Sequence, residues 1–361
     1  MAYIEEAVNS GKISGNGIFT NKCHQFLEEK YNINKCLLTT SCTDALEMSA
    51  ILLDITEGDE VILPSYTFVS TANAFLIRGA KLIFADSYYD NPNIDASKLE
   101  QLITPKTKAI VLVHYAGVAC DLDLIMALAN KYNLYVIEDA AQAIDASYNQ
   151  KPLGSIGHLA AFSFHETKNL IAGEGGALMI NTPKFAKRSE IIWEKGTNRT
   201  SFYRGEVEKY GWVDIGSSFL PSEIMAAFLY AQLEKMQMIQ NTRMNIWEKY
   251  NQELSTLQKQ GIVYLPTIPK YATHNAHLFY LICNSINERQ NLINHLWQKG
   301  VNAVFHYLPL HLSPFFKNRY SGDPLPNSVR FGECLVRLPL FYELTDSQQA
   351  HIIREVKHFY S

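Results

Sequence analysis

The sequence lacks both an excess of positive charge and any long apolar run. Of its 361 residues, 32 are Lys or Arg and 36 are Asp or Glu, which gives a formal net charge of −4. Without a basic surplus to neutralise phosphates, nucleic-acid binding is disfavoured. The most apolar run, 109–113, ends at His114 and is far shorter than the roughly 20 residues that a membrane span needs. The first residues, Met-Ala-Tyr-Ile-Glu-Glu, lack the regions of a signal peptide, so we expect a cytoplasmic protein with no membrane partner.

Cysteine is also scarce. The six cysteines form no C-x-x-C pair, and none lies beside a histidine at the spacing of a metal finger. We therefore expect reduced and mostly buried thiols, and no metal site. Apolar residues make up 47% of the chain, which is too high for disorder. At about 150 residues per domain, the length suggests roughly two domains.

Short apolar runs alternate with amphipathic runs over the first half of the chain. The apolar runs predict strands at 36–40, 60–63, 80–85, 107–114, 134–138, 159–164 and 177–180. Helical patterns lie between them at 43–53, 71–78, 96–103 and 122–132. This alternation predicts an α/β fold with a largely parallel sheet that is covered on both faces.

The character of the chain changes after residue 195. The polar segment 195–210 predicts an irregular functional loop, and 221–254 has the spacing of a helix. Predicted strands at 277–283 and 301–307 flank a predicted helix at 286–299. We expect a large domain over residues 1–239 and a smaller α+β domain over 240–361.

A lysine follows one of the predicted buried strands. The segment Ser163-Phe-His-Glu-Thr-Lys168-Asn precedes the turn Gly173-Glu-Gly-Gly176. A lysine that is partly desolvated at a strand end can lose its proton and form a Schiff base with a carbonyl. The neighbouring glycines would let the backbone approach a flat cofactor. Alone, the segment favours an ordinary surface lysine, which is what most lysines are.

Two further segments carry polar groups at the ends of predicted strands. The strand 134–138 runs into Glu138 and Asp139, and a carboxylate there can hold a pyridinium nitrogen protonated. A solvated strand end or a magnesium ligand would give the same pattern. The segment Ser41-Cys42-Thr43 leads from a strand into a helix, whose exposed N–H groups suit a phosphate. A simple helix cap would also use these residues.

In chain order, the phosphate turn, the acidic strand end and the lysine match a pyridoxal-phosphate (PLP) enzyme of the aspartate-aminotransferase fold type, fold type I. The chain resembles the DegT/DnrJ/EryC1/StrS family of sugar-nucleotide aminotransferases over nearly its whole length. The motifs that carry the resemblance lie at 64–73, 113–120, 138–142, 163–169, 195–199, 214–218 and 305–311.

The resemblance implies roles for residues around the cofactor ring. Lys168 matches the family's Schiff-base lysine, which also shuttles a proton. Asp139 matches the partner of the pyridine nitrogen, and Gln142 matches a contact of the ring 3-hydroxyl. Phe68 matches the aromatic that stacks on the ring, although a Phe is more often a core residue.

The resemblance also implies contacts to the cofactor phosphate. Thr43 and Ser163 match phosphate ligands, and Cys42 would contribute through its backbone N–H. Ser218 falls where many relatives have an asparagine that reaches the phosphate of the neighbouring subunit. The resemblance therefore implies a homodimer with shared active sites.

Residues on the sugar-nucleotide side are implied by their place in the family motifs: His165, Asn198, Arg199, Arg204, His306, Tyr307 and His311. His165 lies two residues after Ser163 and so faces the same side of an extended strand. The arginines could bind the diphosphate, since Arg binds phosphate oxygens bidentately, or they could be ordinary surface residues.

The family implies L-glutamate as amino donor and a nucleotide ketosugar as acceptor. Within the family, the chain resembles a subgroup that aminates C4 of dTDP-4-oxo-6-deoxyglucose for bacterial surface glycans such as enterobacterial common antigen and lipopolysaccharide. Amination at C3 or on a UDP- or GDP-sugar is an alternative, and a non-catalytic regulator of the same fold is another. Relatives usually carry about ten or more residues ahead of the position of Met1, which help to line the sugar site.

Overall fold

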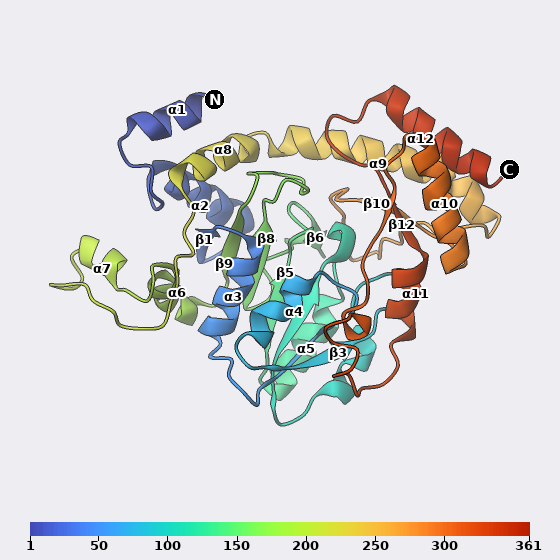
Figure 1. Ribbon diagram of the computed structural model, residues 1–361. Coiled ribbons are helices and arrows are strands. Elements are labelled where there is room, and N and C mark those ends of the chain that lie inside the picture. The colour runs from blue at the N-terminus through green and yellow to red at the C-terminus, as the bar shows by residue number, and fades with distance from the viewer.

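The computed structural model describes residues 1–361. Its centre is a seven-stranded sheet (Figure 1) whose strands run in the order β1 (Lys35–Thr39), β9 (Gly176–Ile180), β8 (Leu159–Ser163), β5 (Tyr135–Asp139), β4 (Thr107–Val113), β2 (Glu60–Pro64) and β3 (Lys81–Ala85). Strand β9 is antiparallel to both of its neighbours, and the pairs between β8 and β3 are parallel. The predicted largely parallel α/β sheet is therefore confirmed.

Helices cover both faces of this sheet because its strands are apolar on both sides. One face packs against α2 (Ile18–Tyr31), α5 (Leu122–Tyr132) and α8 (Glu223–Leu233). The other face packs against α3 (Cys42–Leu52), α4 (Val69–Leu76) and α6 (Ala186–Trp193). The short helices α1 (Ala2–Asn9) and α7 (Arg199–Tyr203) lie outside these layers (Figure 1).

Helix α2 depends on a side chain from α8 for its first turn. Gly17 precedes α2 and offers no side-chain cap. The buried carboxylate of Glu223 accepts hydrogen bonds from the N–H groups of Gly17, Phe19 and Thr20 instead. These are N–H groups that the first turn of a helix leaves without a partner, so Glu223 fixes α2 on α8.

The second sheet has three strands in the order β10 (Phe279–Ile282), β12 (Leu335–Leu338) and β11 (Val304–Phe305), all antiparallel. A separate core joins this sheet to α9 (Met236–Lys259), α10 (Ile286–Gln298) and α12 (Asp346–Phe359). Helix α11 (Pro326–Cys334) leads into β12, and a two-stranded hairpin pairs β6 (Ser147–Tyr148) with β7 (Lys151–Pro152). Position 240, our expected domain boundary, lies inside α9.

Two predicted elements differ from the structure, and one strand was not predicted. Segment 96–103 forms two short 3₁₀ turns, η1 (Ala96–Lys98) and η2 (Glu100–Leu102), because Pro105 follows closely and the run is too short to propagate a helix. The single helix expected at 221–254 is broken between α8 and α9, where the chain passes from the large sheet to the second core (Figure 1). Strand β12, the centre of the small sheet, was not expected at all.

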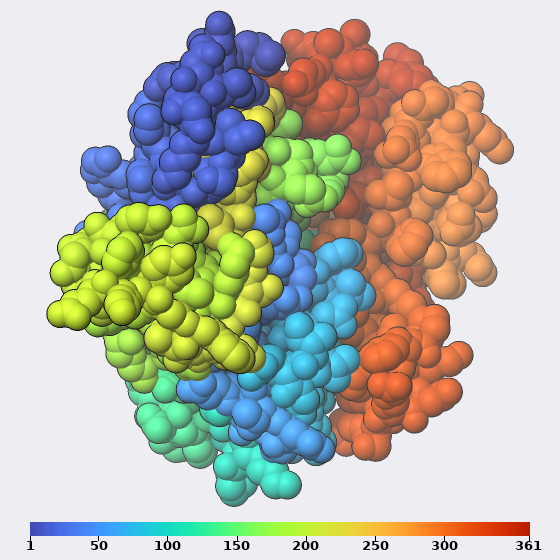
Figure 2. Space-filling model, turned by 60° about the vertical axis from the view of Figure 1, so that its left-hand side comes forward, coloured from blue at the N-terminus to red at the C-terminus, as the bar shows by residue number.

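The segment 195–218, which we call the arm, projects from the body of the molecule (Figures 1 and 2). Its backbone is largely irregular, as the polar segment 195–210 predicted, but that segment also contains the short helix α7, which was not expected. Trp212 and Tyr203 are 84% and 70% exposed there. All six cysteines are free, and five of them are buried. None of the helices combines the length and apolar character that a membrane span requires.

Candidate active site

A cavity of about 430 Å³, which we call the central cavity, lies where strands β4, β5 and β8 end. Its walls include Val113, Asp139 and Ser163, which are the last residues of these strands. The carboxyl edge of a parallel sheet is where open α/β folds bind ligands. The starts of α3 and α4 close one side, and the small sheet contributes the opposite wall.

Lys168 points its amine into this cavity from the loop that follows β8. Hydrogen bonds across the loop, such as Ala172 N–H to the Phe164 carbonyl at 2.7 Å, hold the loop closed. The Lys168 amine has no hydrogen bond or ion pair. Burial is the main cause that lowers the pKa of this amine; the neighbouring carboxylate of Asp139 opposes the shift, and the positive charge of Arg337 adds to it. Burial and the charge of Arg337 favour the unprotonated, nucleophilic form.

Asp139 faces the same cavity from the end of β5 and is buried. The hydroxyl of Thr71 donates to its Oδ2 at 2.7 Å, and the Ala141 N–H donates to its Oδ1 at 3.2 Å. Thr67 hydrogen-bonds Thr71 in turn. No cationic side chain pairs with this carboxylate, and burial raises its pKa. A cationic ring nitrogen is the kind of group that would stabilise its charge.

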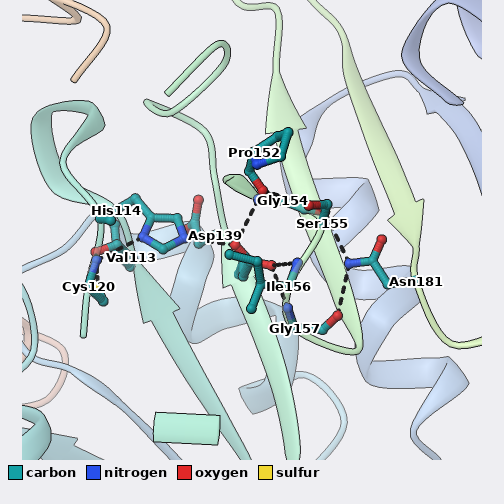
Figure 3. Close-up of polar contacts among 12 residues, drawn as sticks. Val113, His114, Cys120, Asp139, Pro152, Gly154, Ser155, Ile156, Gly157 and Asn181 are labelled. Atoms are coloured by element: carbon teal, nitrogen blue, oxygen red, sulfur yellow. Dashed lines mark hydrogen bonds and ion pairs between the residues drawn. The ribbon is translucent and has the colours of Figure 1, made fainter. Parts of the chain in front are cut away.

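Glu138, the preceding residue, points to the other side of β5 and lies in a closed hydrogen-bond network. Its partners His114, Gly154, Ile156 and Gly157 are labelled in Figure 3. His114 Nδ1 accepts from the Cys120 N–H, so the ring proton is on Nε2, which donates to Glu138 at 2.9 Å. The N–H groups of the turn 154–157 also donate to this carboxylate. Burial opposes the charge, but these hydrogen bonds lower the pKa of Glu138. The network fixes the end of β5, which carries Asp139.

Gln142 and Phe68 complete the wall around Asp139. The Gln142 amide oxygen accepts from the Ala116 N–H at 2.7 Å, and its nitrogen donates to the Tyr307 hydroxyl at 3.2 Å. Phe68 is 55% exposed, and its ring centre lies 6.1 Å from that of Tyr307. An exposed aromatic on a cavity wall fits a stacking role and does not fit a core residue.

The start of α3 forms a polar cradle at the far end of the cavity. The Ser41 hydroxyl caps α3 by accepting from the Asp44 N–H, and Thr43 hydrogen-bonds Ser70 at the start of α4. A Cβ on Gly176 would lie 2.4 Å from the Ser41 carbonyl carbon, so only glycine lets β9 approach this turn. The first N–H groups of a helix have no intrahelical acceptor and attract anions.

These walls fit pyridoxal phosphate, the cofactor that the sequence resemblance implies. One cavity brings together an unpaired amine for the aldehyde, a carboxylate for the ring nitrogen and an exposed aromatic for the ring face. The cradle at α3 suits the phosphate, and the volume lies within the range of cofactor pockets. The structure therefore brings together all but one of the cofactor residues expected from the sequence: Cys42, Thr43, Phe68, Asp139, Gln142, Ser163 and Lys168.

The remaining expected residue, Ser218, lies in the arm, outside the central cavity. It lines a second cavity of about 360 Å³, the arm cavity, together with Lys12, Lys195 and Arg199. Arg204 makes two hydrogen bonds to Glu190 and is also paired with Glu206, which raises the pKa of its guanidinium.

The other candidates for the sugar nucleotide divide between the cavity and the scaffold. His165, His306 and Tyr307 line the central cavity. The side-chain oxygen of Asn198 accepts a hydrogen bond from the Gly211 N–H and so links two segments of the arm. His311 is buried outside the cavity and hydrogen-bonds Ser65 at 2.6 Å, where it fastens the small domain to the end of β2.

Two residues on the small-domain wall were not expected from the sequence, His277 and Arg337. The Asn169 amide donates to the Asn275 carbonyl, so its oxygen accepts from His277 Nδ1 at 2.8 Å. Burial and nearby positive charges keep the pKa of His277 well below its usual value, so this ring is neutral. Two features of the sequence could have pointed to these residues. His277 begins the predicted strand 277–283, and Arg337 interrupts the apolar run 335–340.

Comparison with known proteins agrees with this geometry. Residues 1–357 match the model of the DegT/DnrJ/EryC1/StrS aminotransferase family. The chain is 31% identical to GDP-perosamine synthase of Escherichia coli O157:H7, covering 99% of this chain and 95% of the relative. It is 32% identical to the spore coat polysaccharide biosynthesis protein SpsC of Bacillus subtilis, covering 88% and 83%. The fold matches Spr1654 of Streptococcus pneumoniae in its PLP form with a TM-score of 0.91, 26% identity and 99% and 95% coverage.

Proposed function

Because the chain belongs to the DegT/DnrJ/EryC1/StrS aminotransferase family and is a PLP-dependent sugar aminotransferase of fold type I, we propose that it aminates C4 of dTDP-4-oxo-6-deoxyglucose. L-Glutamate donates the amino group and leaves as 2-oxoglutarate. The sugar product is dTDP-4-amino-4,6-dideoxygalactose, a precursor for bacterial surface glycans such as enterobacterial common antigen and lipopolysaccharide. The resemblance of segments 163–169 and 195–218 supports this choice of acceptor.

The residues of the central cavity divide the work of the reaction. Bound pyridoxal phosphate supplies a carbonyl that accepts the amino group and a ring that withdraws electrons from the reacting carbon. Lys168 takes the proton from the donor α-carbon and returns protons in each half-reaction. Asp139 holds the proton on the ring nitrogen, and Phe68 covers one face of the ring. The buried setting of Lys168 allows this, because burial lowers the pKa of its amine.

One observation carries the assignment to amino transfer. Lys168 is an unpaired amine on the wall of the same cavity as the buried carboxylate Asp139 and the polar cradle of α3. A regulator of the same fold has no need for an unpaired, desolvated amine at this point. The lysine therefore favours an enzyme over a non-catalytic binding protein.

The proposed enzyme is a homodimer with shared active sites. Ser218 lies outside the central cavity of its own chain, and the arm that carries it projects from the body (Figure 2). Exposed aromatics on the arm, such as Trp212, are typical of a surface that is covered by a partner. The six free thiols favour a cytoplasmic location.

The experiment is a glutamate-dependent assay with purified protein and pyridoxal phosphate. We expect dTDP-4-oxo-6-deoxyglucose to be aminated, with the product and its C4 stereochemistry read by mass spectrometry and NMR. Lys168→Ala should give no product. Full activity of that variant would overturn the assignment to amino transfer, and equal turnover without glutamate would overturn the donor.

A second acceptor class is tested in the same assay. GDP-perosamine synthase of E. coli, which is 31% identical, favours a GDP-linked sugar as the alternative. GDP-linked 4-ketosugars, UDP-linked 4-ketosugars and a 3-ketosugar should react more slowly than the dTDP substrate. Faster turnover of any of them would replace the proposed acceptor and leave the amino transfer intact.

A further inference from the structure

His277 lines the central cavity with a ring nitrogen that has no partner. Its side chain is buried, with 5% of its surface exposed, and it lies just before β10 on the wall that the small domain supplies. Nδ1 is hydrogen-bonded to the Asn169 side chain at 2.8 Å, and Nε2 makes no hydrogen bond. A buried polar atom without a partner is costly, so Nε2 is available to a group that reaches it inside the cavity.

The contacts of Asn169 fix which ring nitrogen carries the proton. The Asn169 amide nitrogen donates to the Gln240 side-chain oxygen at 2.8 Å and to the Asn275 carbonyl at 2.7 Å. Because a backbone carbonyl can only accept, the atom that faces His277 is the amide oxygen, and Nδ1 donates to it. Burial is the main cause that keeps the pKa of His277 well below its usual value, so the ring is neutral. Nε2 therefore carries a lone pair and no proton.

A lone pair on a neutral ring accepts hydrogen bonds from N–H or O–H groups and does not bind anions. The titratable groups that act on this ring are Lys168, Arg243, Arg337 and His306. Arg243 donates to three backbone carbonyls, and His306 uses its Nδ1 on a tyrosine hydroxyl. Arg337 belongs to the small domain, as His277 does, and makes no hydrogen bond to Nε2 there. Lys168 is the group that changes its bonding during the reaction.

Lys168 and His277 are held next to each other by one short segment. Lys168 directly precedes Asn169, whose amide oxygen holds the ring of His277, and both Lys168 and His277 line the central cavity. After burial, the positive charge of Lys168 is the next cause that lowers the pKa of His277. The Lys168 amine has no partner, and its four-carbon stem lets the amine turn within the cavity.

We propose that Nε2 of His277 accepts a hydrogen bond from the Lys168 amine whenever this lysine is not bonded to the cofactor. The inference rests on the proposed function, in which Lys168 takes a proton from the donor α-carbon and returns it. As the C–H bond breaks, an N–H bond forms on Lys168, and the electron pair of the C–H bond stays with the substrate and the cofactor. His277 takes no proton. Its lone pair stabilises and directs the ammonium group, so His277 is a positioning residue.

A hydroxyl of the acceptor sugar is the other donor that would suit this lone pair. The sugar is present in only one half-reaction, so Nε2 would be left unpaired in the other. Lys168 belongs to the chain itself and moves a proton in both half-reactions. The neighbouring position of Asn169 and Lys168 in the chain therefore favours the lysine.

Three variants separate the lone pair from the contact with Asn169. In His277→Asn, the shorter amide can still donate to Asn169 but places no acceptor at the position of Nε2. In His277→Gln, the longer amide carries an oxygen to that position. His274→Asn is the matched control, because His274 is a half-buried histidine of the same segment that packs on Trp247 outside the cavity.

The first readout needs no turnover. In protein loaded with pyridoxamine phosphate (PMP), Lys168 is free, and its reductive methylation by formaldehyde is followed by mass spectrometry across a pH series. Below the pKa of Lys168, His277→Asn should be methylated at this lysine about tenfold faster than wild type. The reason is that losing the acceptor lowers this pKa by about one, which leaves more of the amine unprotonated. Above both pKa values the two rates should be equal.

The control and the rescue variant sharpen this readout. His277→Gln should lie between His277→Asn and wild type, and His274→Asn should behave as wild type. Faster methylation by the same factor at every pH would show only easier access to the cavity and would overturn the inference. An unchanged pH profile in His277→Asn would overturn it too.

The second readout follows the two half-reactions of the holoenzyme by absorbance. At saturating substrate, His277→Asn should slow the conversion of the PLP form by L-glutamate and its return by dTDP-4-oxo-6-deoxyglucose, each about tenfold, because Lys168 moves a proton in both. The apparent binding of L-glutamate should change less than about threefold. With L-glutamate deuterated at the α-carbon, the isotope effect should be at least as large as in wild type.

The outcomes distinguish this inference from its alternatives. A smaller isotope effect would show that a step other than proton transfer has been slowed, and a loss confined to the sugar half-reaction would assign Nε2 to a hydroxyl of the acceptor. Either result would overturn the contact with Lys168. If the methylation profile shifts as expected but no ketosugar is aminated, the proposed function fails and the contact between His277 and Lys168 stands.

Discussion

Glu138 and Asp139 are neighbouring buried carboxylates with opposite chemistry. Successive residues of a strand point to opposite sides, so Glu138 meets His114 and the turn 154–157, and Asp139 meets the central cavity. Glu138 collects hydrogen bonds that lower its pKa, and burial raises the pKa of Asp139. The first carboxylate stabilises the fold, and the second is available for a ligand.

Asp139→Asn should therefore separate stability from function. The pKa of Asp139 is higher in the folded state than in the unfolded state. The folded protein therefore loses stability as the pH rises from the unfolded-state pKa through the folded-state pKa of this carboxyl group. In cofactor-free protein at pH 7, the variant should be more stable than wild type by about 1 kcal/mol, and its affinity for pyridoxal phosphate should fall. Urea denaturation and a cofactor titration measure the two effects. The stability gain should shrink as the pH is lowered, and a loss of stability at pH 7 would contradict the argument.

Residues that end strongly apolar strands could be predicted from the sequence. Asp139, Ser163 and Lys168 follow such runs, and the parallel sheet brings their positions to one edge. Arg337 and His277 could not be placed in this way. They reach the cavity because β10 and β12, more than 50 residues apart, pair in a small sheet, and no local pattern specifies that pairing.

Glu138 joins three elements of the large domain. Its carboxylate ties β5 to His114, which follows β4, and to the turn that precedes β8. Sequence periodicity located these strands but not the turn, because the turn is ordered by the buried carboxylate of another element. Similarly, Glu223 caps α2 from α8, which replaces the cap that the sequence before α2 lacks.

Glu138→Gln should destabilise the protein by about 3 kcal/mol at pH 7, because a buried amide would face N–H donors without an acceptor for each. The folded-state pKa of Glu138 is lowered, so its stabilisation is complete above the unfolded value of about 4.3 and is lost as pH falls through the folded value. Denaturant titrations at pH 7 and at acidic pH should show the gap between wild type and variant closing.

The matched control for this prediction is Glu100→Gln. Glu100 is an exposed carboxylate paired with Lys131 and Tyr132, and its loss should leave stability nearly unchanged. Equal effects of the two substitutions, or a gap that widens at acidic pH, would show that the Glu138 network does not stabilise β5.

At the scale of the whole molecule, the central cavity is assembled from two cores. The large domain supplies Asp139 at the end of β5 and Lys168 on the loop after β8, and the small domain supplies His306, Tyr307 and Arg337. The α/β class and most strands of the large sheet were predictable because their patterns are local. The closure of the small domain over the site depends on contacts between distant segments. The place of the arm depends further on a second copy of the chain in the proposed dimer.

If the proposed dimer shares its active sites, two variants that are inactive alone should regain activity when they form a mixed dimer. Lys168→Ala removes the reacting amine, and Ser218→Glu places a negative charge where the partner's cofactor phosphate would lie. Each variant alone should be inactive, although Ser218→Glu should still fold, because Ser218 lies in the projecting arm.

If Lys168 and Ser218 of one site come from different subunits, a mixed dimer holds one site with both changes and one wild-type site. Dissociating and reassembling equal amounts of the two should restore about a quarter of wild-type activity, because half of the dimers are mixed and half of their sites are intact. An inactive mixture that sedimentation shows to contain mixed dimers would place Ser218 and Lys168 of each site in the same chain.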